Sequence, residues 1–402
     1  MGIPAQNQQH TRGGSLDSPS ARAVSGDYDS FKTLPMNQQQ LAEAAALEFQ
    51  IEGKFSRAFP YGSGHINDTY CAVFLRAEVP RRFILQRINT GIFRNPAALM
   101  ENIQRVTSHV GAQLAGQPDS ARRVLSLIPT RDGRASHQDE EGNHWRAYRF
   151  IEDARTCDTV ESTHQAFQAA RAFGQFQNML ADFPLPRLHD TIPDFHHTPK
   201  RFAAFEQALA TNPAGRATDA KPEIEFAFAH QSVARVLLNA NLPERVTHND
   251  TKFNNVMFDD ATGEGLCVVD LDTVMPGLAL YDFGDMVRTA TSPAHEDERD
   301  LSKVTMQFPM FEALARGYLS AAGSFLTEVE KQHLVFAGKL ITFEQGIRFL
   351  TDYLSGDTYY KVHRNAHNLD RCRTQFKLIQ SIEQQEEKMS LLMSRLARED
   401  FE

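Results

Sequence analysis

The stretch Thr247-His248-Asn249-Asp250-Thr251-Lys252-Phe253-Asn254-Asn255 contains the pattern from which the fold of this chain can be predicted. Its His, Asp and Asn at positions 248, 250 and 255 fit H-x-D-x-x-x-x-N, the spacing of the catalytic loop in kinases. The stretch continues as VMFDD, a glycine-containing turn and LCVVDLD, so that Asp270 ends an apolar strand. In such a loop the Asp orients and deprotonates a hydroxyl, and the Asn ligates a metal ion. The pattern therefore predicts a phosphoryl-transfer site on a kinase-like fold.

Phosphoryl transfer divides its work between side chains, because a metal ion must neutralise the phosphates while a separate base positions the nucleophile. We accordingly expect Asp250 to be the base, and Asn255 and Asp270 to hold Mg²⁺ on ATP. Asp272 could support the metal or the substrate, or could only satisfy the backbone of the turn before PGLALYDFGD. Lys252 falls where many kinase loops keep a lysine that reaches the transferring phosphate, and a solvated surface lysine is the alternative.

The plain alternative for the whole stretch is a β-hairpin whose turn contains Asn and Asp, which are common in turns. We favour the catalytic interpretation because the motif occurs together with an apolar strand ending in Asp-Leu-Asp and with a series of strands before it. Just beyond, Asp282, Asp285 and Arg288 lie where buried carboxylates often brace a catalytic loop. Structural bracing is the role that we expect for these three residues.

The residues before this stretch predict a small antiparallel sheet. Three segments with strand character are separated by turn residues: FSRAFPY, TYCAVFLRA and RFILQRI. Asn95-Pro96 then predicts a helix start, with Leu99, Ile103, Val106 and Val110 on one face. Two more strand candidates are RRVLSLIPT and HWRAYRFI, and the connection between them, DGRASHQDEEGN, should be a solvated loop. Five strands with one inserted helix are typical of a kinase small lobe.

Beyond position 152 the pattern becomes mainly helical, with segments around 162–181, 199–210, 222–239, 308–321, 327–355 and 370–397. We therefore predict an α+β, two-lobed protein-kinase-like fold. Its small nucleotide-binding lobe covers 36–152, and its larger lobe, with the catalytic loop, the metal site and the acceptor site, covers 153–402. Residues 1–35 are rich in Ser, Gly, Gln and Asp, so we expect a disordered tail there.

Nucleotide binding is expected from the small lobe. Gly62, Ser63 and Gly64 join two strands, and the two glycines let backbone amides approach a phosphate closely. Phe150 and Ile151 end the last strand, where a connecting segment would offer backbone donors and acceptors to adenine. The chain has no GxxxxGK[ST] motif, so a P-loop NTPase is not supported.

A cation for the α/β-phosphates is expected on the strand RFILQRI, with a partner on the following helix. We choose Arg87 as the cation and Glu101 as the carboxylate that holds it. Because adjacent strand residues face opposite sides of a sheet, Gln86 could point inward in place of Arg87. The sequence leaves that choice open, and a solvent-facing charge is the alternative role for Arg87.

Composition narrows the possible partners and location. The formal net charge of -9 argues against a nucleic-acid partner, which needs a basic surface. The four cysteines lie far apart without zinc spacing, which favours a reduced protein. We see no secretory signal and no long apolar run, so we expect a cytoplasmic protein without a membrane partner. The sequence does not determine the oligomeric state.

Several strings of the chain resemble a known family closely, over roughly Phe55 to Arg364. They are YGSGHINDTY, FILQRIN, LMENI, THNDTKFNNVMFD, CVVDLDTVMPGLALYDFGDMVR and FLTDYLSGDTYY, and they look like the N-acetylhexosamine 1-kinases of the aminoglycoside phosphotransferase and choline kinase superfamily. The resemblance implies transfer of the ATP γ-phosphate to the 1-hydroxyl of N-acetylglucosamine or N-acetylgalactosamine. By matching positions it also implies that Arg348 and Tyr359, together with the base Asp250, bind the sugar.

Each of these implied roles has an alternative. Arg348 could be a salt-bridged helix residue, and Tyr359 could cover the edge of a core. Another kinase substrate, such as N-acetylmuramate, an unacetylated hexosamine, choline or an aminoglycoside, would leave the fold and nucleotide chemistry unchanged. A nucleotide-binding pseudokinase is less favoured, because it would be expected to lack the base or a metal ligand. The preference between the two C4 epimers, and the acceptance of other hexoses, are not visible in the sequence.

Overall fold

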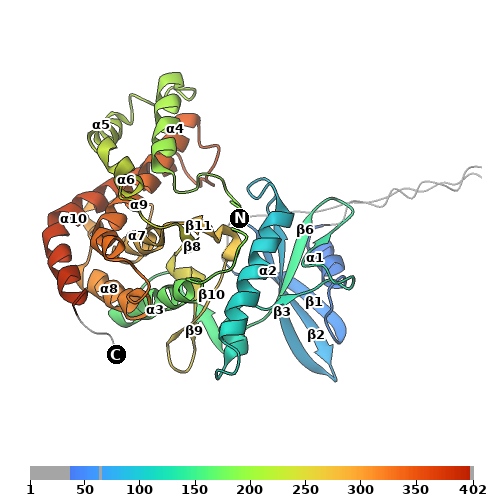
Figure 1. Ribbon diagram of the computed structural model, residues 1–402. Coiled ribbons are helices and arrows are strands. Elements are labelled where there is room, and N and C mark those ends of the chain that lie inside the picture. Colours follow the sequence, from blue (N-terminus) through green and yellow to red (C-terminus); the bar gives the residue numbers. More distant parts are fainter. Residues whose placement is uncertain (1–36, 63–65, 399–402) are drawn as a thin grey trace, which may run out of the picture. The chain divides into compact units, whose positions relative to one another are not determined.

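A computed structural model describes residues 37–62 and 66–398 of the chain. The tail predicted over 1–35 and the two loop residues Ser63 and Gly64 lie outside these described residues. The described part is α+β, with a sheet lobe followed by a mainly helical lobe (Figure 1). None of its helices has both the length and the apolar character that crossing a bilayer requires.

The sheet lobe is built from one antiparallel sheet in the order β1-β2-β3-β6-β4, with β5 paired to β6. Its elements are α1 (Gln38–Ala46), β1 (Lys54–Pro60), β2 (Asp68–Arg76), β3 (Val79–Ile88), β4 (Leu127–Ile128), β5 (His137–Gln138) and β6 (His144–Arg149). One face of the sheet packs with α1 around Trp145, Leu85 and Phe74. The predicted antiparallel small lobe is confirmed by this arrangement.

The described sheet has six strands, where the sequence predicted five. The candidate RRVLSLIPT contributes only the two residues Leu127–Ile128, and the connection predicted to be a loop contributes β5. β5 pairs with β6 at His137 and Trp145, and a tight turn that begins at Asp139 connects the two strands. Asp139 accepts hydrogen bonds from the backbone of Asn143 and from the indole of Trp145, so a buried aromatic residue anchors a segment whose composition is that of a loop.

Helix α2 (Pro96–Gln113) stands between the sheet and the helical lobe (Figure 1). As predicted, Asn95 caps it and Pro96 begins it, and its apolar face is buried. That face joins the core of the helical lobe as well as the sheet. Asn102, which has no exposed surface, donates hydrogen bonds to the carbonyls of His189 and Val274 and accepts one from the His189 amide. One helix therefore ties the two lobes together.

The helical lobe contains two small sheets among its helices. β7 (Ala154–Thr156), β9 (Val256–Asp259) and β10 (Gly265–Val268) form one sheet, and β8 (Arg245–Thr247) and β11 (Met275–Gly277) form the other. The helices are α3 (Thr163–Met179), α4 (Thr198–Thr211), α5 (Lys221–Ala229), α6 (Val236–Asn239), α7 (Ala279–Ala290), α8 (Phe308–Ala322), α9 (Glu328–Ser355) and α10 (His367–Leu396). The six helical segments expected from the sequence are all present, one of them divided between α5 and α6.

Helix α7 is the described helix that the sequence analysis missed. Its residues ALYDFGDMVRTA follow Pro276 and Gly277 and contain Gly284 and two Asp, all of which lower helix propensity. Nearly every residue of α7 is buried, and it packs tightly against α9. Tertiary packing therefore overrides local propensity in this segment.

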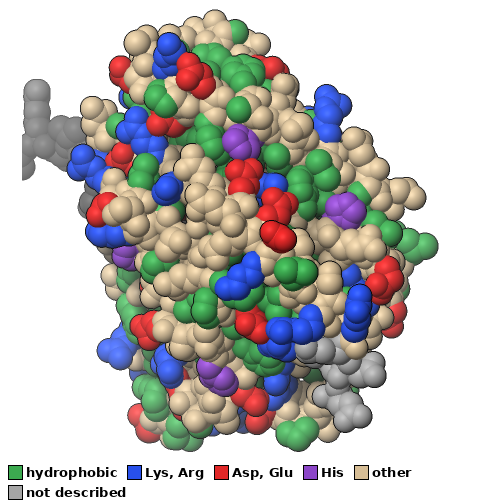
Figure 2. All heavy atoms as spheres, turned by 90° about the vertical axis from the view of Figure 1, so that its left-hand side faces the viewer, with side chains coloured by type: hydrophobic (Ala, Val, Ile, Leu, Met, Phe, Trp, Pro, Cys, Tyr) green, Lys and Arg blue, Asp and Glu red, His purple; other side chains and the backbone are tan. Residues whose placement is uncertain are grey.

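The outer face of the helical lobe shows acidic and basic side chains interspersed among apolar and polar ones (Figure 2). Ion pairs across neighbouring elements contribute to this mixture, such as Lys339 with Glu386 and Arg373 with Glu223. The face in this view therefore carries no one-sign field of the kind that attracts a polyanion. Chemistry has to be sought in the interior and between the lobes.

Gly284 allows α7 to approach α9 closely, so its replacement by Ala should be destabilising. A Cβ at this position would clash with the carbonyl of Ala337 on α9. We expect Gly284→Ala to lower the free energy of unfolding by about 1–3 kcal/mol, because a packed helix interface resists added volume. The measurement is urea unfolding followed by circular dichroism.

Gly111→Ala is the matched control in α2, where the nearest atom to an added Cβ is a methyl of Val124 at 4.0 Å. This change should leave stability unchanged or raise it by up to about 1 kcal/mol through helix propensity. Equal stability of the two variants would contradict the close-packing argument.

Candidate functional site

The predicted catalytic loop connects β8 to β9. After Thr247 the chain passes through Asn249 and a single 3-10 turn, Phe253–Asn255. Asn249 has φ +64°, in the left-handed region that Asn tolerates better than most side chains. Its side-chain amide donates to the carbonyls of Thr247 at 3.2 Å and Thr273 at 3.0 Å. The unusual backbone of the loop is thus fixed by one of its own side chains.

Asp282, near the start of α7, fixes the backbone of the loop by hydrogen bonds. Its two carboxylate oxygens accept hydrogen bonds from the backbone amides of His248 at 2.9 Å and Asn249 at 2.7 Å. One of these oxygens also accepts from the amide of Gln177 at 2.6 Å, and the side chain is fully buried. Burial raises the pKa of Asp282 above its usual value, although these donors partly oppose the shift. The bracing role predicted for Asp282 is confirmed by these contacts.

His248 is a structural residue of the loop. Its Nε2 lies 2.9 Å from the carbonyl of Val269, and its Nδ1 accepts a hydrogen bond from the backbone amide of Asp250 at 3.3 Å. One nitrogen donates and the other accepts, so the ring is the neutral tautomer with its proton on Nε2. It packs edge-on against Phe173 and Phe176. The ring therefore links the loop to α3 and to the end of β10.

Asp250 lies between a cation and an amide. Its Oδ2 is 2.9 Å from Nζ of Lys252, and the side-chain amide of Asn255 donates to its carbonyl at 2.7 Å and to Oδ2 at 3.3 Å. Burial alone would raise the pKa of Asp250, but Lys252 holds it below its ordinary value. The carboxylate is consequently ionised at neutral pH and can accept a proton.

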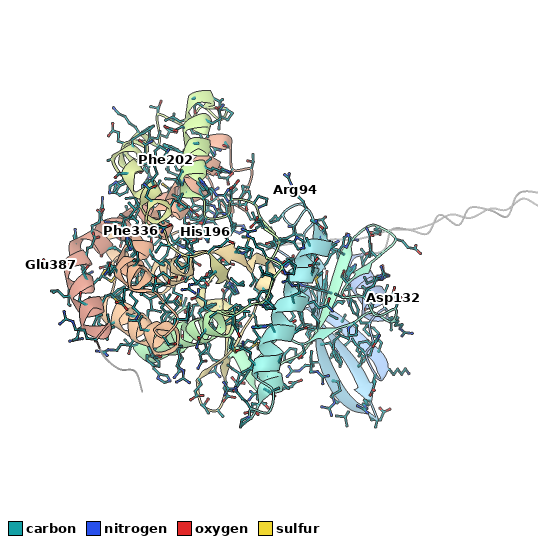
Figure 3. The ribbon with its side chains drawn as sticks, in the orientation of Figure 1. Arg94, Asp132, His196, Phe202, Phe336 and Glu387 are labelled. Carbon is teal, nitrogen blue, oxygen red and sulfur yellow. The ribbon has the colours of Figure 1, made fainter. Side chains whose placement is uncertain are left out.

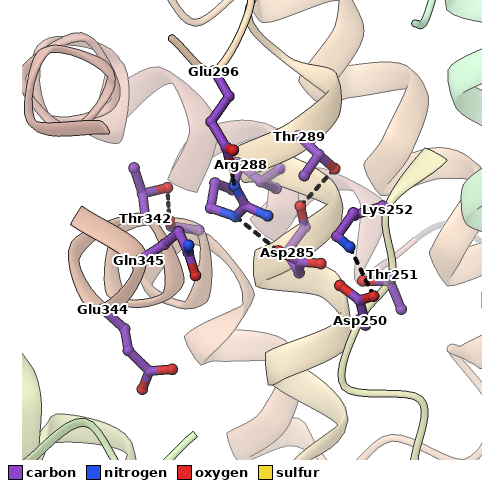
Figure 4. A network of polar contacts seen from close by, with 12 residues as sticks. Asp250, Thr251, Lys252, Asp285, Arg288, Thr289, Glu296, Thr342, Glu344 and Gln345 are labelled. Carbon is purple, nitrogen blue, oxygen red and sulfur yellow. Dashed lines mark hydrogen bonds and ion pairs between the residues drawn. The ribbon is translucent and has the colours of Figure 1, made fainter. Parts of the chain in front are cut away.

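A wider polar network surrounds this pair (Figure 4). Arg288 donates to Asp285 and to Glu296, each at 2.8 Å, and Asp285 and Arg288 are both buried. Asp285 lies between this arginine and the Asp250–Lys252 pair in the close view. The buried Asp285–Arg288 pair on α7 agrees with the bracing role expected from the sequence.

Asp270 ends β10 with its backbone in the left-handed region at φ +59°. Asp270 lines the cleft between the two lobes that is described below, and it is exposed to solvent there. Its pKa is raised to about 6, chiefly because the surrounding protein removes water from it and secondarily because Asp272 and Asp250 are close. A carboxylate in such a position gains from a nearby cation.

Asp272 has a different role from the supporting metal ligand proposed for it from the sequence. Its Oδ2 accepts a hydrogen bond from the side-chain amide of Asn67 at 2.6 Å, and its Oδ1 pairs with the guanidinium of Arg146. All three side chains are buried, and Asn67 and Arg146 belong to the sheet lobe. Each oxygen of Asp272 already has a partner from the sheet lobe. It is a contact between the lobes.

The remaining two predicted ligands fit a divalent cation. Asn255 uses its amide nitrogen for its bonds to Asp250, and within the described residues its amide oxygen makes no hydrogen bond. Amide and carboxylate oxygens are ligands that Mg²⁺ accepts, usually together with water and phosphate oxygens. Desolvation raises the pKa of Asp270, and the nearby carboxylates of Asp272 and Asp250 raise it further, so an added cation would stabilise its ionised form. Asn255 and Asp270 could therefore hold Mg²⁺.

A cleft of about 290 Å³ collects most of the residues predicted for nucleotide and metal binding. Those that line it are Gly62, Phe150, Ile151, Lys252, Asn255 and Asp270. Gly62 has φ +80°, and a Cβ added there would meet no atom within 4 Å, so the backbone at this point is open to the cleft. Phe150 is covered by Tyr61, whose ring centroid is 5.6 Å away. The cleft is thus bounded by both lobes.

The ion pair predicted between Arg87 and Glu101 does not form. Arg87 pairs instead with Asp68 on the neighbouring strand, at 2.5 Å, and is absent from the lining of the cleft. Glu101 lies 2.9 Å from Nε2 of His189 on the surface. The physical reason is the alternation of the strand, since Gln86 faces the cleft and Arg87 therefore faces the other side.

Arg146 is a cation of the sheet lobe that lines the cleft and that the sequence analysis missed. It lies on β6 directly across from Gln86 on β3, and its Nε donates to the Gln86 side chain at 2.9 Å. Gln86 in turn donates to Thr69 at 3.0 Å. The buried Trp145 and Ala147 face the opposite side, so alternation within HWRAYR could have placed Arg146 on the cleft side.

A second cavity, of about 200 Å³, contains both residues that the family resemblance assigned to sugar recognition. Arg348 comes from α9, and Tyr359 from the segment after it, where its side chain is 58% exposed. Arg201 from α4, Asp352 and Tyr360 are further polar residues of the lining. The backbone of Tyr359 is held by Asp352, which accepts its amide at 2.8 Å.

His196 connects this cavity to the catalytic loop from the interior of the helical lobe (Figure 3). Its Nε2 lies 2.9 Å from the carbonyl of Asn249, and its Nδ1 lies 2.8 Å from Glu344, one helical turn before Arg348 on α9. Both partners are acceptors, so the ring must carry a proton on each nitrogen. Burial alone would lower the pKa of His196, but Glu344 raises it above its usual value. His196 is therefore a buried imidazolium.

Removing this imidazolium should be costly and should depend on pH. We expect His196→Ala to lower the free energy of unfolding by about 3–5 kcal/mol at pH 6, because it leaves Glu344 buried without its cation. A raised pKa in the folded protein gives stabilisation that is complete below about pH 6.5 and decreases as pH rises through the folded pKa. Glu344, whose pKa is lowered by His196 against the effect of burial, stays ionised in that range.

The measurement is urea unfolding of the wild type and the variant from pH 6 to pH 9. The difference between them should shrink as pH rises. His164→Ala, at an exposed position, is the control and should change stability little at any pH. A pH-independent cost for His196→Ala would contradict the charged state of the ring.

Comparison with solved structures gives the same two-lobed fold. A microcompartment-associated aminopropanol kinase is 15% identical, with a TM-score of 0.56 over 88% of this chain and 98% of its own. A spectinomycin phosphotransferase in complex with ADP and spectinomycin is 13% identical, with a TM-score of 0.55 over 88% of this chain and 100% of its own. At sequence identities this low, the similarity to these two structures shows a shared fold only.

An aminoglycoside phosphotransferase from Alicyclobacillus acidocaldarius subsp. acidocaldarius DSM 446 is 12% identical, with a TM-score of 0.52 over 90% of this chain and 96% of its own. Residues 59–323, more than half of the chain, match the model of the phosphotransferase enzyme family. This span includes the cleft, the catalytic loop and α7. The chain belongs to the phosphotransferase enzyme family.

Proposed function

We propose that this protein is an ATP-dependent kinase that phosphorylates the 1-hydroxyl of N-acetylhexosamines, giving the sugar 1-phosphate. The observation that carries the proposal is the position of Asp250. It is an ionised carboxylate on a loop whose backbone Asp282 holds, and it is bonded to two residues that line the cleft, Lys252 and Asn255. A base in that position is what transfer of a phosphoryl group to a hydroxyl requires.

ATP would bind in the cleft between the lobes. Membership of the phosphotransferase family supports this assignment, as does the ADP in the complex of the spectinomycin phosphotransferase. Phe150 and Ile151 would contact the base, and the backbone near Gly62 would contact the phosphates. Lys252 and Arg146 line the cleft, and we assign to them, each paired with an aspartate, the phosphate contact expected of Arg87. Mg²⁺ held by Asp270 and Asn255 would neutralise phosphate charge when bound.

The chemical step follows from the charge states of the loop. The acceptor hydroxyl would lie against the free face of Asp250, which takes its proton as the hydroxyl oxygen bonds to the γ-phosphorus. The bond between that phosphorus and the ADP oxygen breaks, and ADP leaves. Lys252, whose pKa is raised by Asp250 against the effect of burial, stays protonated throughout. It holds the base in place and offers an ammonium to the transferring group.

The sugar assignment rests on the resemblance to N-acetylhexosamine 1-kinases and on the second cavity. Arg348 and Tyr359 lie in that cavity, and His196 joins the helix of Arg348 to the residue before Asp250. Guanidinium and phenol groups suit the hydroxyl and carbonyl oxygens of an N-acetylated sugar. An amine such as aminopropanol would bring its positive charge next to two arginines. The cavity therefore favours a neutral or acidic acceptor over a basic one.

The test is ADP release from Mg-ATP with N-acetylglucosamine, N-acetylgalactosamine, N-acetylmuramate, glucosamine, choline and an aminoglycoside, with phosphorus NMR of each product. We expect turnover with the two N-acetylhexosamines and a product phosphorylated at the anomeric oxygen. Turnover only with choline or the aminoglycoside would refute the sugar assignment while keeping the kinase. The absence of turnover with every acceptor, in a protein that binds ADP, would refute the kinase proposal and favour a nucleotide-binding pseudokinase.

A further inference from the structure

The second cavity contains two arginines that lack carboxylate partners. Within residues 37–62 and 66–398, neither Arg201 nor Arg348 has an Asp or Glu oxygen within the 4.0 Å of an ion pair. Arg201 donates from Nε and Nη2 to the carbonyl of Phe195, at 3.2 and 2.9 Å. Arg348 donates from Nη1 to Gln345 at 3.1 Å. The acceptors of these bonds are neutral, and the charge of Glu344 acts on both arginines without forming an ion pair with either.

One residue positions both guanidinium groups. Arg348 lies over the ring of Phe195, 5.3 Å from its centroid, while Arg201 binds the carbonyl of the same residue. A further ring, that of Tyr360, lies 5.9 Å from Arg348. Aromatic faces support a guanidinium without neutralising it. The two cations are thereby held in fixed places with free N–H donors.

Two acidic residues near these cations, Glu344 and Asp352, are engaged in other hydrogen bonds. Glu344 bonds to His196 and Thr198 through its two oxygens. Asp352, which lines the same cavity, accepts from five donors: the backbone amides of Thr358, Tyr359 and Tyr360, the hydroxyl of Thr358 and the side chain of Asn368. Neither carboxylate can turn toward the arginines without giving up buried hydrogen bonds.

Arg348 and Arg201 line one small cavity and carry like charges. Burial lowers the pKa of Arg201, and the charge of Arg348 lowers it further, while Glu344 acts in the opposite direction. Two guanidinium groups on one small cavity repel each other, and an anion between them would relieve the repulsion. Carboxylate and phosphate oxygens match the planar donor fork of arginine in geometry as well as in charge.

From this arrangement we propose that Arg201 and Arg348 form a subsite for an anionic group on the acceptor, so that the preferred substrate is an acidic N-acetylhexosamine. The inference rests on the proposed function and narrows its substrate class. The acidic group is a carboxylate or a phosphate ester on a sugar carbon other than the one phosphorylated. The anomeric hydroxyl then remains free to face Asp250.

Binding is the first test, because it needs neither turnover nor a variant. Calorimetry of the wild type would compare N-acetylmuramate, a carboxylate-bearing ether of N-acetylglucosamine, with the uncharged amide of the same molecule. N-acetylglucosamine 6-phosphate and N-acetylglucosamine form a second pair. We expect the acid of at least one pair to bind about tenfold or more tightly than its neutral partner, since hydrogen bonds to charged groups are the stronger ones. The pair that shows the difference identifies carboxylate or phosphate.

The second test assigns the difference to the arginine pair. Arg201→Met keeps the length of the side chain and removes its charge, and it should bring the acid-to-neutral affinity ratio close to one. Arg299→Met, at a side chain that is 78% exposed outside the cavity, is the control and should keep the wild-type ratio. Circular dichroism would show whether the Arg201 variant is folded, and Arg201→Gln would replace it if it is not.

Equal binding of acid and neutral partner by the wild type in both pairs would overturn the inference, as would a ratio that survives in the folded Arg201 variant. Turnover of N-acetylglucosamine with equal binding in both pairs would refute only the acidic subsite. Selective binding of an acid without phosphorylation of any sugar would refute the proposed function and leave the anion subsite standing. The two failures are thus distinguishable.

Discussion

The rest of the site depends on one buried carboxylate, that of Asp282, which binds two consecutive backbone amides of the catalytic loop. These amides belong to His248 and Asn249, and the left-handed backbone of Asn249 turns the chain so that Asp250 comes next. Without a fixed partner, two adjacent buried N–H groups would destabilise that turn. Helix α7 carries Asp282 and packs closely on α9 at Gly284. The position of the loop is therefore fixed relative to α9.

Charge balance between the lobes is the second constraint. Arg146 neutralises Asp272 across the lobe boundary, and Lys252 neutralises Asp250 within the loop. Asp270 has no ion-pair partner among the described residues, and desolvation by the surrounding protein raises its pKa to about 6. The three carboxylates therefore differ in kind: one joins the lobes, one is ionised and ready to take a proton, and one gains from an added cation. That difference is the physical basis for dividing metal binding from base catalysis.

The sequence predicted the parts of the molecule that local patterns control. The catalytic motif, the amphipathic face of α2 and the long helices of the C-terminal lobe were found because periodicity and turn residues mark them. The missed features depend on contacts between distant residues. Arg146 resembles a surface arginine until β6 pairs with β3, and Arg201 and His196 meet α9 only in the folded chain. The Arg87–Glu101 pair failed for the same reason, because strand alternation places Gln86 on the cleft side.

The central claim is that Asp250 is the base and Asp270 is a metal ligand, and Mn²⁺ binding in the presence of ADP tests that division most directly. Free Mn²⁺ can be counted by electron paramagnetic resonance for the wild type, Asp250→Asn and Asp270→Asn. We predict that Asp250→Asn binds Mn²⁺ like the wild type yet loses turnover by about 100-fold or more, because it removes only the base. Asp270→Asn should bind Mn²⁺ at least about tenfold more weakly, because a charged ligand is lost. Loss of Mn²⁺ binding in Asp250→Asn, together with its retention in Asp270→Asn, would contradict the assignment.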